Sequence, residues 1–287
     1  MGEVNGRAGG EGLPSDQRLA RYLADALETG DGGDLRARLQ SGSGLRGPRP
    51  NLRLVREFAA AAGSVAGQPD PPVATLEALL DGWAAIGEDE APGDQPAVIL
   101  PCAAAAAYGE IAIVRPEWWA DEMAKLRRAA PDPRWRVREA VATALQQVLD
   151  ADWDRTAEAL VEWAGGGEPP HARAAVTAVA EPRLLIDPSR HQAATQIQRR
   201  AVARLAATPA ADRRAAPVRA LRQALGFTIS VVTAASGDFA LLDQLVRARD
   251  PDLAWVAREN LEKARLARWP DQVAALKARQ KISSGGA

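Results

Sequence analysis

Apolar residues recur along this chain with the period of an α-helix. Between Val137 and Val148 they fall at positions i, i+3, i+4, i+7, i+8 and i+11, which places them on one stripe of a helix. The chain is rich in Ala, Leu, Arg and Glu, whereas the strand-favouring residues Ile, Tyr, Phe and Thr are scarce. The pattern therefore predicts an all-α protein.

Glycine, proline and acidic clusters divide this pattern into segments. Two helices are expected between residues 15 and 40, and two more at 51–63 and 73–86, with Gly63 and Gly87 as their stops. Further helices are expected at 97–114, 116–128, 133–149, 152–165, 171–185, 190–207, 212–226, 238–248 and 252–268. The 97–114 segment contains a single charged residue, Glu110, which predicts a helix buried inside the protein.

One phrase, P-D-x-x-W-x-x-R-E, occurs twice in the chain. It starts at Pro131 and again at Pro251, a spacing of 120 residues that accommodates three helical hairpins of about 40 residues each. Asp132 stands where a helix N-cap is expected, and Pro133 occupies the first helical position. The repetition predicts stacked helical hairpins, with the tryptophan of each copy as a packing residue.

The repeated phrase resembles the HEAT repeat, in which an aspartate in the turn and an arginine on the next helix bridge neighbouring units. By this resemblance Asp132 would pair with Arg138, and Asp252 with Arg258. The resemblance covers roughly residues 97–268 and implies an α-α superhelix, a HEAT- or armadillo-like solenoid, of about six helical hairpins. The domains expected are a disordered tail at 1–14, an acidic helical region at 15–96, a HEAT-like repeat region at 97–278 and a disordered tail at 279–287.

The net charge of −1 conceals two halves of opposite sign. Residues 1–114 carry 9 basic against 16 acidic residues, a charge of −7, while residues 115–287 carry 27 against 21, a charge of +6. Within the second half, residues 183–222 hold nine arginines and two aspartates. Such a stretch favours binding to a nucleic acid or to a protein partner. The partner-binding residues predicted are Arg199, Arg200, Arg204, Arg213, Arg214 and Arg222.

Few other residues of the chain are candidates for a catalytic or metal-binding site. Cys102 is the only cysteine, so an internal disulfide is excluded and a cytoplasmic location is expected. His171 and His191 are too far apart in sequence for a helical metal-binding pair, and neither a metal nor a cofactor is expected. A membrane partner is not expected either. The sequence predicts a non-catalytic scaffold that binds its partner through a concave, arginine-rich surface.

A second interpretation starts from tryptophans that lie beside carboxylates. This combination resembles the DNA alkylation-repair glycosylases built from HEAT-like repeats, which hold damaged DNA in a basic groove with tryptophans and an aspartate. The resemblance implies, as an alternative, a DNA-binding repair protein. Its candidate catalytic residues would be Trp118, Trp119, Asp121, Trp153 and Asp154. The simpler interpretation of the same residues is packing by the tryptophans and helix capping by the carboxylates.

Overall fold

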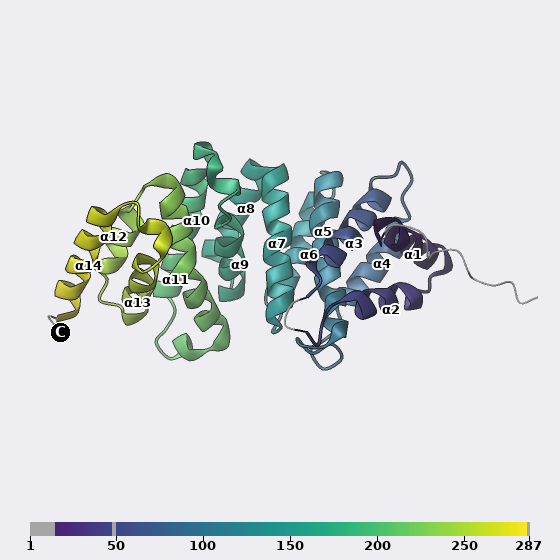
Figure 1. The fold of residues 1–287 in the computed structure, drawn as a ribbon, viewed down its shortest axis with the longest axis horizontal. Coiled ribbons are helices and arrows are strands. Elements are labelled where there is room, and N and C mark those ends of the chain that lie inside the picture. Colours follow the sequence, from purple (N-terminus) through teal and green to yellow (C-terminus); the bar gives the residue numbers. More distant parts are fainter. Residues whose placement is uncertain (1–14, 48–49, 286–287) are drawn as a thin grey trace, which may run out of the picture. The chain divides into compact units, whose positions relative to one another are not determined.

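The computed structural model describes residues 15–47 and 50–285, and in these ranges it contains 14 α-helices, five short 3-10 helices and no β-strand (Figure 1). The prediction of an all-α protein is confirmed. The predicted tail at 1–14 lies outside the described residues. The chain forms two compact units, residues 1–144 and 145–287, and the division falls inside helix α7 (Trp135–Ala151) rather than at the predicted change near residue 96.

The first unit is built around helix α5 (Ile99–Val114), which contacts α2, α3, α4 and α6. Those helices, together with α1, span α1 Ser15–Thr29, α2 Gly33–Gly42, α3 Leu52–Ala66, α4 Val73–Ala84 and α6 Trp119–Ala129. Thirteen of the 16 residues of α5 are buried, which confirms the predicted inner helix. The segment Pro96–Val114 is long and apolar enough to cross a membrane, but 78% of its apolar window is buried, as in a core helix.

Gly63 does not end helix α3, contrary to the sequence prediction. The helix continues to Ala66, and Gly63 lies at a close crossing of α3 with α5. A Cβ atom at Gly63 would lie 2.5 Å from Cγ of Glu110. The glycine is therefore explained by interhelical packing rather than by chain termination.

The second unit is a series of helical pairs. Its helices are α8 Trp153–Gly166, α9 Pro169–Val179, α10 His191–Ala206, α11 Ala216–Ser236, α12 Ala240–Val246, α13 Pro251–Leu261 and α14 Pro270–Gly285. Helix α8 pairs with α9, α10 with α11 and α12 with α13, while α8 also contacts α10, α9 contacts α11 and α11 contacts α13. Each hairpin is thus packed against the next one.

The C-terminal segment corrects a sequence expectation. Helix α14 contacts α12 and α13 and buries Leu276, so packing continues past residue 268. Residues 279–285, predicted as a disordered tail, form the last turns of α14, and residues 286–287 lie outside the described residues.

The first copy of the repeated phrase does not start its helix where the sequence predicts. Helix α7 begins at Trp135, so Asp132 and Pro133 precede it. Asp132 forms an ion pair of 2.6 Å with Arg134 instead of Arg138, whose Nη1 donates to the main-chain carbonyls of Asp132 and Pro133. Trp135 is 52% exposed, so this tryptophan is not a core packing residue.

The second copy folds in a different register. Helix α13 begins at Pro251, and its N-cap is Asp250, which accepts hydrogen bonds from the amides of Asp252 and Leu253. Trp255 is half-buried and packs against Gly226 of α11, where an added Cβ atom would lie 2.9 Å from the indole ring. The two identical phrases therefore have different helix starts and different tryptophan environments.

Candidate functional site

The nine arginines between residues 183 and 222 divide into two groups. Five of them contact carboxylates or main-chain carbonyls of the second unit: Arg183, Arg190, Arg204, Arg213 and Arg222. The other four are exposed and form no hydrogen bond or ion pair with any residue that the structure describes: Arg199, Arg200, Arg214 and Arg219. This division separates arginines that are paired within the second unit from exposed arginines that have no polar partner among the described residues.

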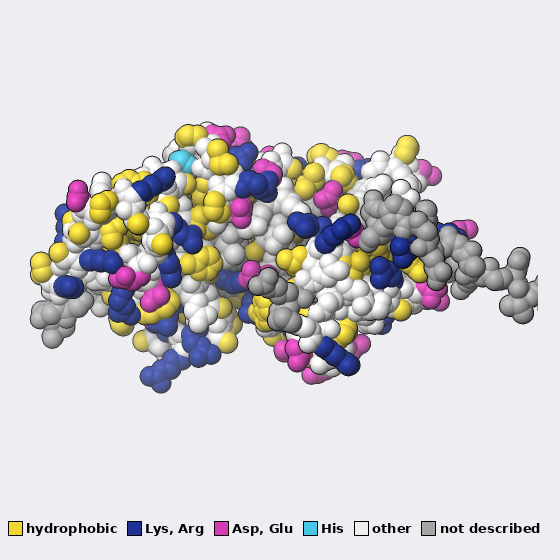
Figure 2. All heavy atoms as spheres, in the orientation of Figure 1, with side chains coloured by type: hydrophobic (Ala, Val, Ile, Leu, Met, Phe, Trp, Pro, Cys, Tyr) yellow, Lys and Arg dark blue, Asp and Glu magenta, His cyan; other side chains and the backbone are white. Residues whose placement is uncertain are grey.

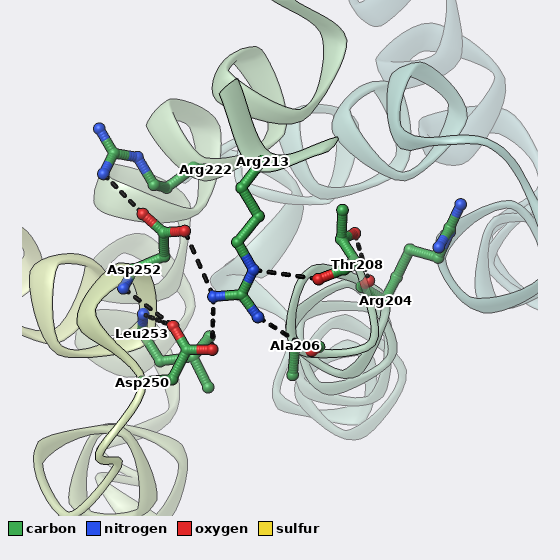
Figure 3. Close-up of polar contacts among 8 residues, drawn as sticks. All are labelled: Arg204, Ala206, Thr208, Arg213, Arg222, Asp250, Asp252 and Leu253. Atoms are coloured by element: carbon green, nitrogen blue, oxygen red, sulfur yellow. Dashed lines mark hydrogen bonds and ion pairs between the residues drawn. The ribbon is translucent and has the colours of Figure 1, made fainter. Parts of the chain in front are cut away.

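Arg213 and Arg222 join the α10–α11 hairpin to the start of α13 (Figure 3). Nη1 of Arg213 lies 2.5 Å from Asp250 and 3.4 Å from Asp252, and its other nitrogens donate to the carbonyls of Thr208 and Ala206. Nη1 of Arg222 lies 2.8 Å from Asp252. We call these four charged residues the Arg–Asp knot. The sequence assigned Arg213 and Arg222 to a partner, but both are occupied inside the protein.

The knot also changes the acidity of one member. Burial by itself would raise the pKa of Asp250, but hydrogen bonds from Arg213 and from the amides of Leu253 and Asp252 lower the pKa below its ordinary value. Asp250 is therefore ionised at neutral pH and holds the N-terminus of α13, where a carboxylate is favoured by the exposed amides. Asp252, predicted to pair with Arg258, bridges to the preceding hairpin through Arg222.

Arg200 and Arg204 line a groove between the end of α8 and α10. The groove measures about 600 Å³ and is bordered by Glu162, by the glycines at 165–167 and by Glu168. Nε of Arg204 donates to the carbonyl of Gly167. The aliphatic part of the Arg200 side chain lies beside Gly165, where an added Cβ atom would be 3.3 Å from Cδ of Arg200. Arg200 is nevertheless exposed.

The candidate repair residues are separated by the division of the chain. Trp118, Trp119 and Asp121 lie at the start of α6 in the first unit. Trp153 and Asp154 lie at the start of α8 in the second unit. Neither unit by itself gathers the full set.

Four of these five candidates, Trp118, Trp153, Asp121 and Asp154, are in positions that structure alone can explain. The guanidinium of Arg115 lies 4.3 Å from the ring centre of Trp118, and that of Arg190 lies 5.1 Å from the ring centre of Trp153. Asp121 and Asp154 are exposed in the first turns of their helices, where negative charge is stabilised by the helix dipole.

Both histidines have structural contacts. Nδ1 of His171 accepts a hydrogen bond from the Glu168 amide as part of a capping box at α9. Nε2 of His191 lies 2.9 Å from the carbonyl oxygen of Leu185. These contacts explain both histidines by their local structural roles.

Sequence reasoning missed a buried charge cluster in the first unit. Nζ of Lys125 lies 2.8 Å from Oε1 of Glu122 and 3.0 Å from Oε1 of Glu77, and the Tyr108 hydroxyl donates to Asp81 at 2.6 Å. Glu122 is 1% exposed, and its Oε2 atom is buried without a hydrogen-bond partner among the described residues. The only sequence signal was the i, i+3 spacing of Glu122 and Lys125, which does not indicate burial.

The chain matches no protein-family model, no curated protein and no solved structure. The assignment of a function therefore depends on the side chains described above. Among the residues predicted to bind a partner, Arg199, Arg200 and Arg214 are the three that form no hydrogen bond or ion pair with a described residue.

Proposed function

We propose that this protein is a non-catalytic helical-repeat scaffold of the HEAT-like solenoid type, and that it binds an anionic macromolecular partner. The observation that carries the proposal is the division of the arginines at 183–222. Arg213 and Arg222 are neutralised by Asp250 and Asp252, whereas Arg199, Arg200 and Arg214 are exposed and have no carboxylate partner. Charge that contributes nothing to internal pairing is available for recognition.

The architecture of the second unit supports this proposal. Consecutive hairpins contact one another through α8 and α10, through α9 and α11, and through α11 and α13. Nearest-neighbour packing of this kind is the basis of helical repeat proteins, whose extended surfaces serve as binding platforms. The proposed surface lies on α10 and its connection to α11, and it requires neither a metal nor a cofactor.

The test measures binding of fluorescent polyanions at low salt. The probes are a duplex DNA, a single-stranded DNA and an acidic peptide, and the variant is R199E/R200E/R214E. A matched control is R36E/R46E/R56E, which makes the same charge change at exposed arginines of the first unit. We expect at least one probe to bind, about tenfold weaker binding by the first variant, and little change in the control.

Two results would contradict the proposal. The first is the absence of binding by every probe at low salt. The second is an equal loss of affinity in both variants, which would show that binding depends only on the net charge of the protein. Preferential binding of duplex DNA, with loss on substitution of Trp118 or Trp153, would instead support the DNA-binding alternative.

A further inference from the structure

Three arginines without a polar partner among the described residues lie next to members of the Arg–Asp knot along the chain. Arg214 follows Arg213 in the chain, and Arg249 precedes Asp250, so the contact between Arg213 and Asp250 brings the two connections together (Figure 3). Arg219 lies one helical turn before Arg222, which is bound to Asp252. Arg214, Arg219 and Arg249 are exposed and form no hydrogen bond or ion pair within the described chain. We call these three residues the arginine edge.

The knot leaves the arginine edge with an excess of positive charge. Its two arginines are balanced by its two aspartates, so its net charge is zero. The edge contributes three positive charges, and Asp212 is the exposed acidic residue next to it in the chain. Figure 2 shows basic side chains gathered over the α10–α11 connection, at the lower left of the molecule.

The knot also fixes the backbone that carries the edge. Arg213 donates to the carbonyls of Thr208 and Ala206 and pairs with Asp250, so the α10–α11 connection is tied both to its own helix and to the start of α13. Arg214 and Arg249 are thus attached to constrained segments of neighbouring hairpins. Preorganisation of this kind reduces the entropy lost on binding.

We propose that the arginine edge binds a carboxylate-rich segment of a protein partner, and this rests on the proposed scaffold function. The planar guanidinium group matches a carboxylate in two-point geometry, and Arg214, Arg219 and Arg249 each have an uncommitted guanidinium. A peptide with a few Asp or Glu residues can place its carboxylates at separate arginines. The edge spans two adjacent hairpins, so such a segment would cross from one repeat to the next.

A nucleic acid fits this surface less well than an acidic peptide. Nucleic-acid backbones carry regularly spaced phosphates and are best bound by a long, continuous basic track. The edge is short and lies beside the carboxylates of Asp212, Asp250 and Asp252.

The experiment measures fluorescence anisotropy with a labelled peptide of about ten residues in which Glu and Gly alternate. The binding proteins are the full chain, the edge variant R214Q/R219Q/R249Q, the R199E/R200E variant and the control R36Q/R46Q/R56Q. Glutamine removes the charge with little effect on folding at exposed positions, and a thermal melt checks each variant. We expect the edge variant to bind about tenfold more weakly, the control to bind within about twofold of the parent, and parental affinity to fall with salt.

The outcomes distinguish the inference from the function on which it rests. If the edge variant binds with parental affinity while R199E/R200E binds weakly, the inference about the arginine edge is overturned but the scaffold proposal remains. Tighter, edge-dependent binding of a single-stranded DNA of equal charge would overturn the choice of an acidic peptide. Absence of binding by every anionic probe would overturn both proposals.

Discussion

The side chain of Asn260 in α13 accepts a 2.7 Å hydrogen bond from the main-chain amide of Ser230 in α11. Its Nδ2 atom donates to the carbonyls of Leu225, at 2.7 Å, and Val256, at 2.8 Å. Asn260 is 0% exposed, so the amide group satisfies main-chain groups that water cannot reach. It therefore fixes how α13 packs against α11.

Replacement of Asn260 by Leu should destabilise the second unit by about 2–4 kcal/mol, because it removes the buried hydrogen bonds of Asn260 with the Ser230 amide and the Leu225 carbonyl. Urea unfolding followed by circular dichroism measures the change. The matched control is Q244A at an exposed residue of α12, which should change stability by no more than about 0.5 kcal/mol. Equal stability of N260L and the parent would show that the hydrogen bonds are unimportant.

A second prediction concerns Arg134, which is 3% exposed. Its guanidinium pairs with both oxygens of Asp132 and donates to the carbonyls of Gly87 and Ala91. Arg134→Met should cost about 3–5 kcal/mol, because it removes the cation that pairs with the Asp132 carboxylate and the guanidinium donors to the carbonyls of Gly87 and Ala91.

The control for R134M is R136M. Arg136 stacks on the exposed ring of Trp135, with its guanidinium carbon 4.4 Å from the ring centre, and its loss should cost about 1 kcal/mol or less. Both variants are compared by urea unfolding. A smaller loss of stability for R134M than for R136M would contradict the conclusion that the buried contacts of Arg134 stabilise the fold.

The third prediction uses the pH dependence of stability. Burial raises the pKa of Glu122 above its ordinary value of 4.5, although Lys125 opposes this shift. A raised pKa means that the folded state holds the proton more tightly than the unfolded state. The free energy of unfolding contributed by Glu122 therefore falls as the pH rises from 4.5 through the raised pKa.

Glu122→Gln removes this titration. The free energy of unfolding of the variant should therefore rise relative to that of the parent as the pH increases from 4.5 through the raised pKa of Glu122. Urea unfolding of both proteins across the acid-to-neutral range gives the difference, in which the contributions of other groups cancel. Lys125→Gln is the comparison variant, and it should destabilise because Glu122 and Glu77 lose their shared cation. A pH-independent difference between E122Q and the parent would refute the raised pKa.

The fourth prediction concerns the reactivity of Cys102. Burial raises the pKa of its thiol to about 12, despite the opposing charge of Arg134. At about pH 8 the native protein should react with iodoacetamide far more slowly than the unfolded protein, because little thiolate is present and the sulfur is buried. Mass spectrometry of timed reactions measures the labelled fraction.

The control for thiol labelling is S41C in a C102A background, which places the cysteine at an exposed position. It should react at similar rates before and after unfolding. Rapid labelling of native Cys102 would show that α5 opens readily or that its burial is incomplete.

Most of the helices could be predicted from the sequence, because periodicity and turn residues are local signals. The start of α8 after Asp152 and the buried face of α7 are examples. The ends of α3 and α11 could not be predicted in this way. Gly63 and Gly226 resemble stops, but each lies within a helix at a place where another element packs closely, beside Glu110 and Trp255. Whether a glycine ends a helix or permits a close crossing depends on a partner distant in sequence.

The candidate binding residues show the same limit. The sequence identified the arginine-rich segment at 183–222, since composition alone reveals it. It could not show that Arg213 is bound to Asp250 and Asp252, and Arg222 to Asp252, because these partners are 30 to 39 residues away along the chain. Nor could it show that Arg249 lies near this segment.

The two copies of the repeated phrase show which features follow from the sequence and which depend on the tertiary structure. The sequence by itself determined that the protein is helical and where most helices lie, because helix formation follows from local propensity and a periodic apolar stripe. Only the tertiary structure decided that Trp135 is exposed while Trp255 packs on Gly226, and that the knot neutralises some arginines and leaves others unpaired. Burial and ion pairing depend on the neighbours that folding supplies, and identical segments acquire different neighbours.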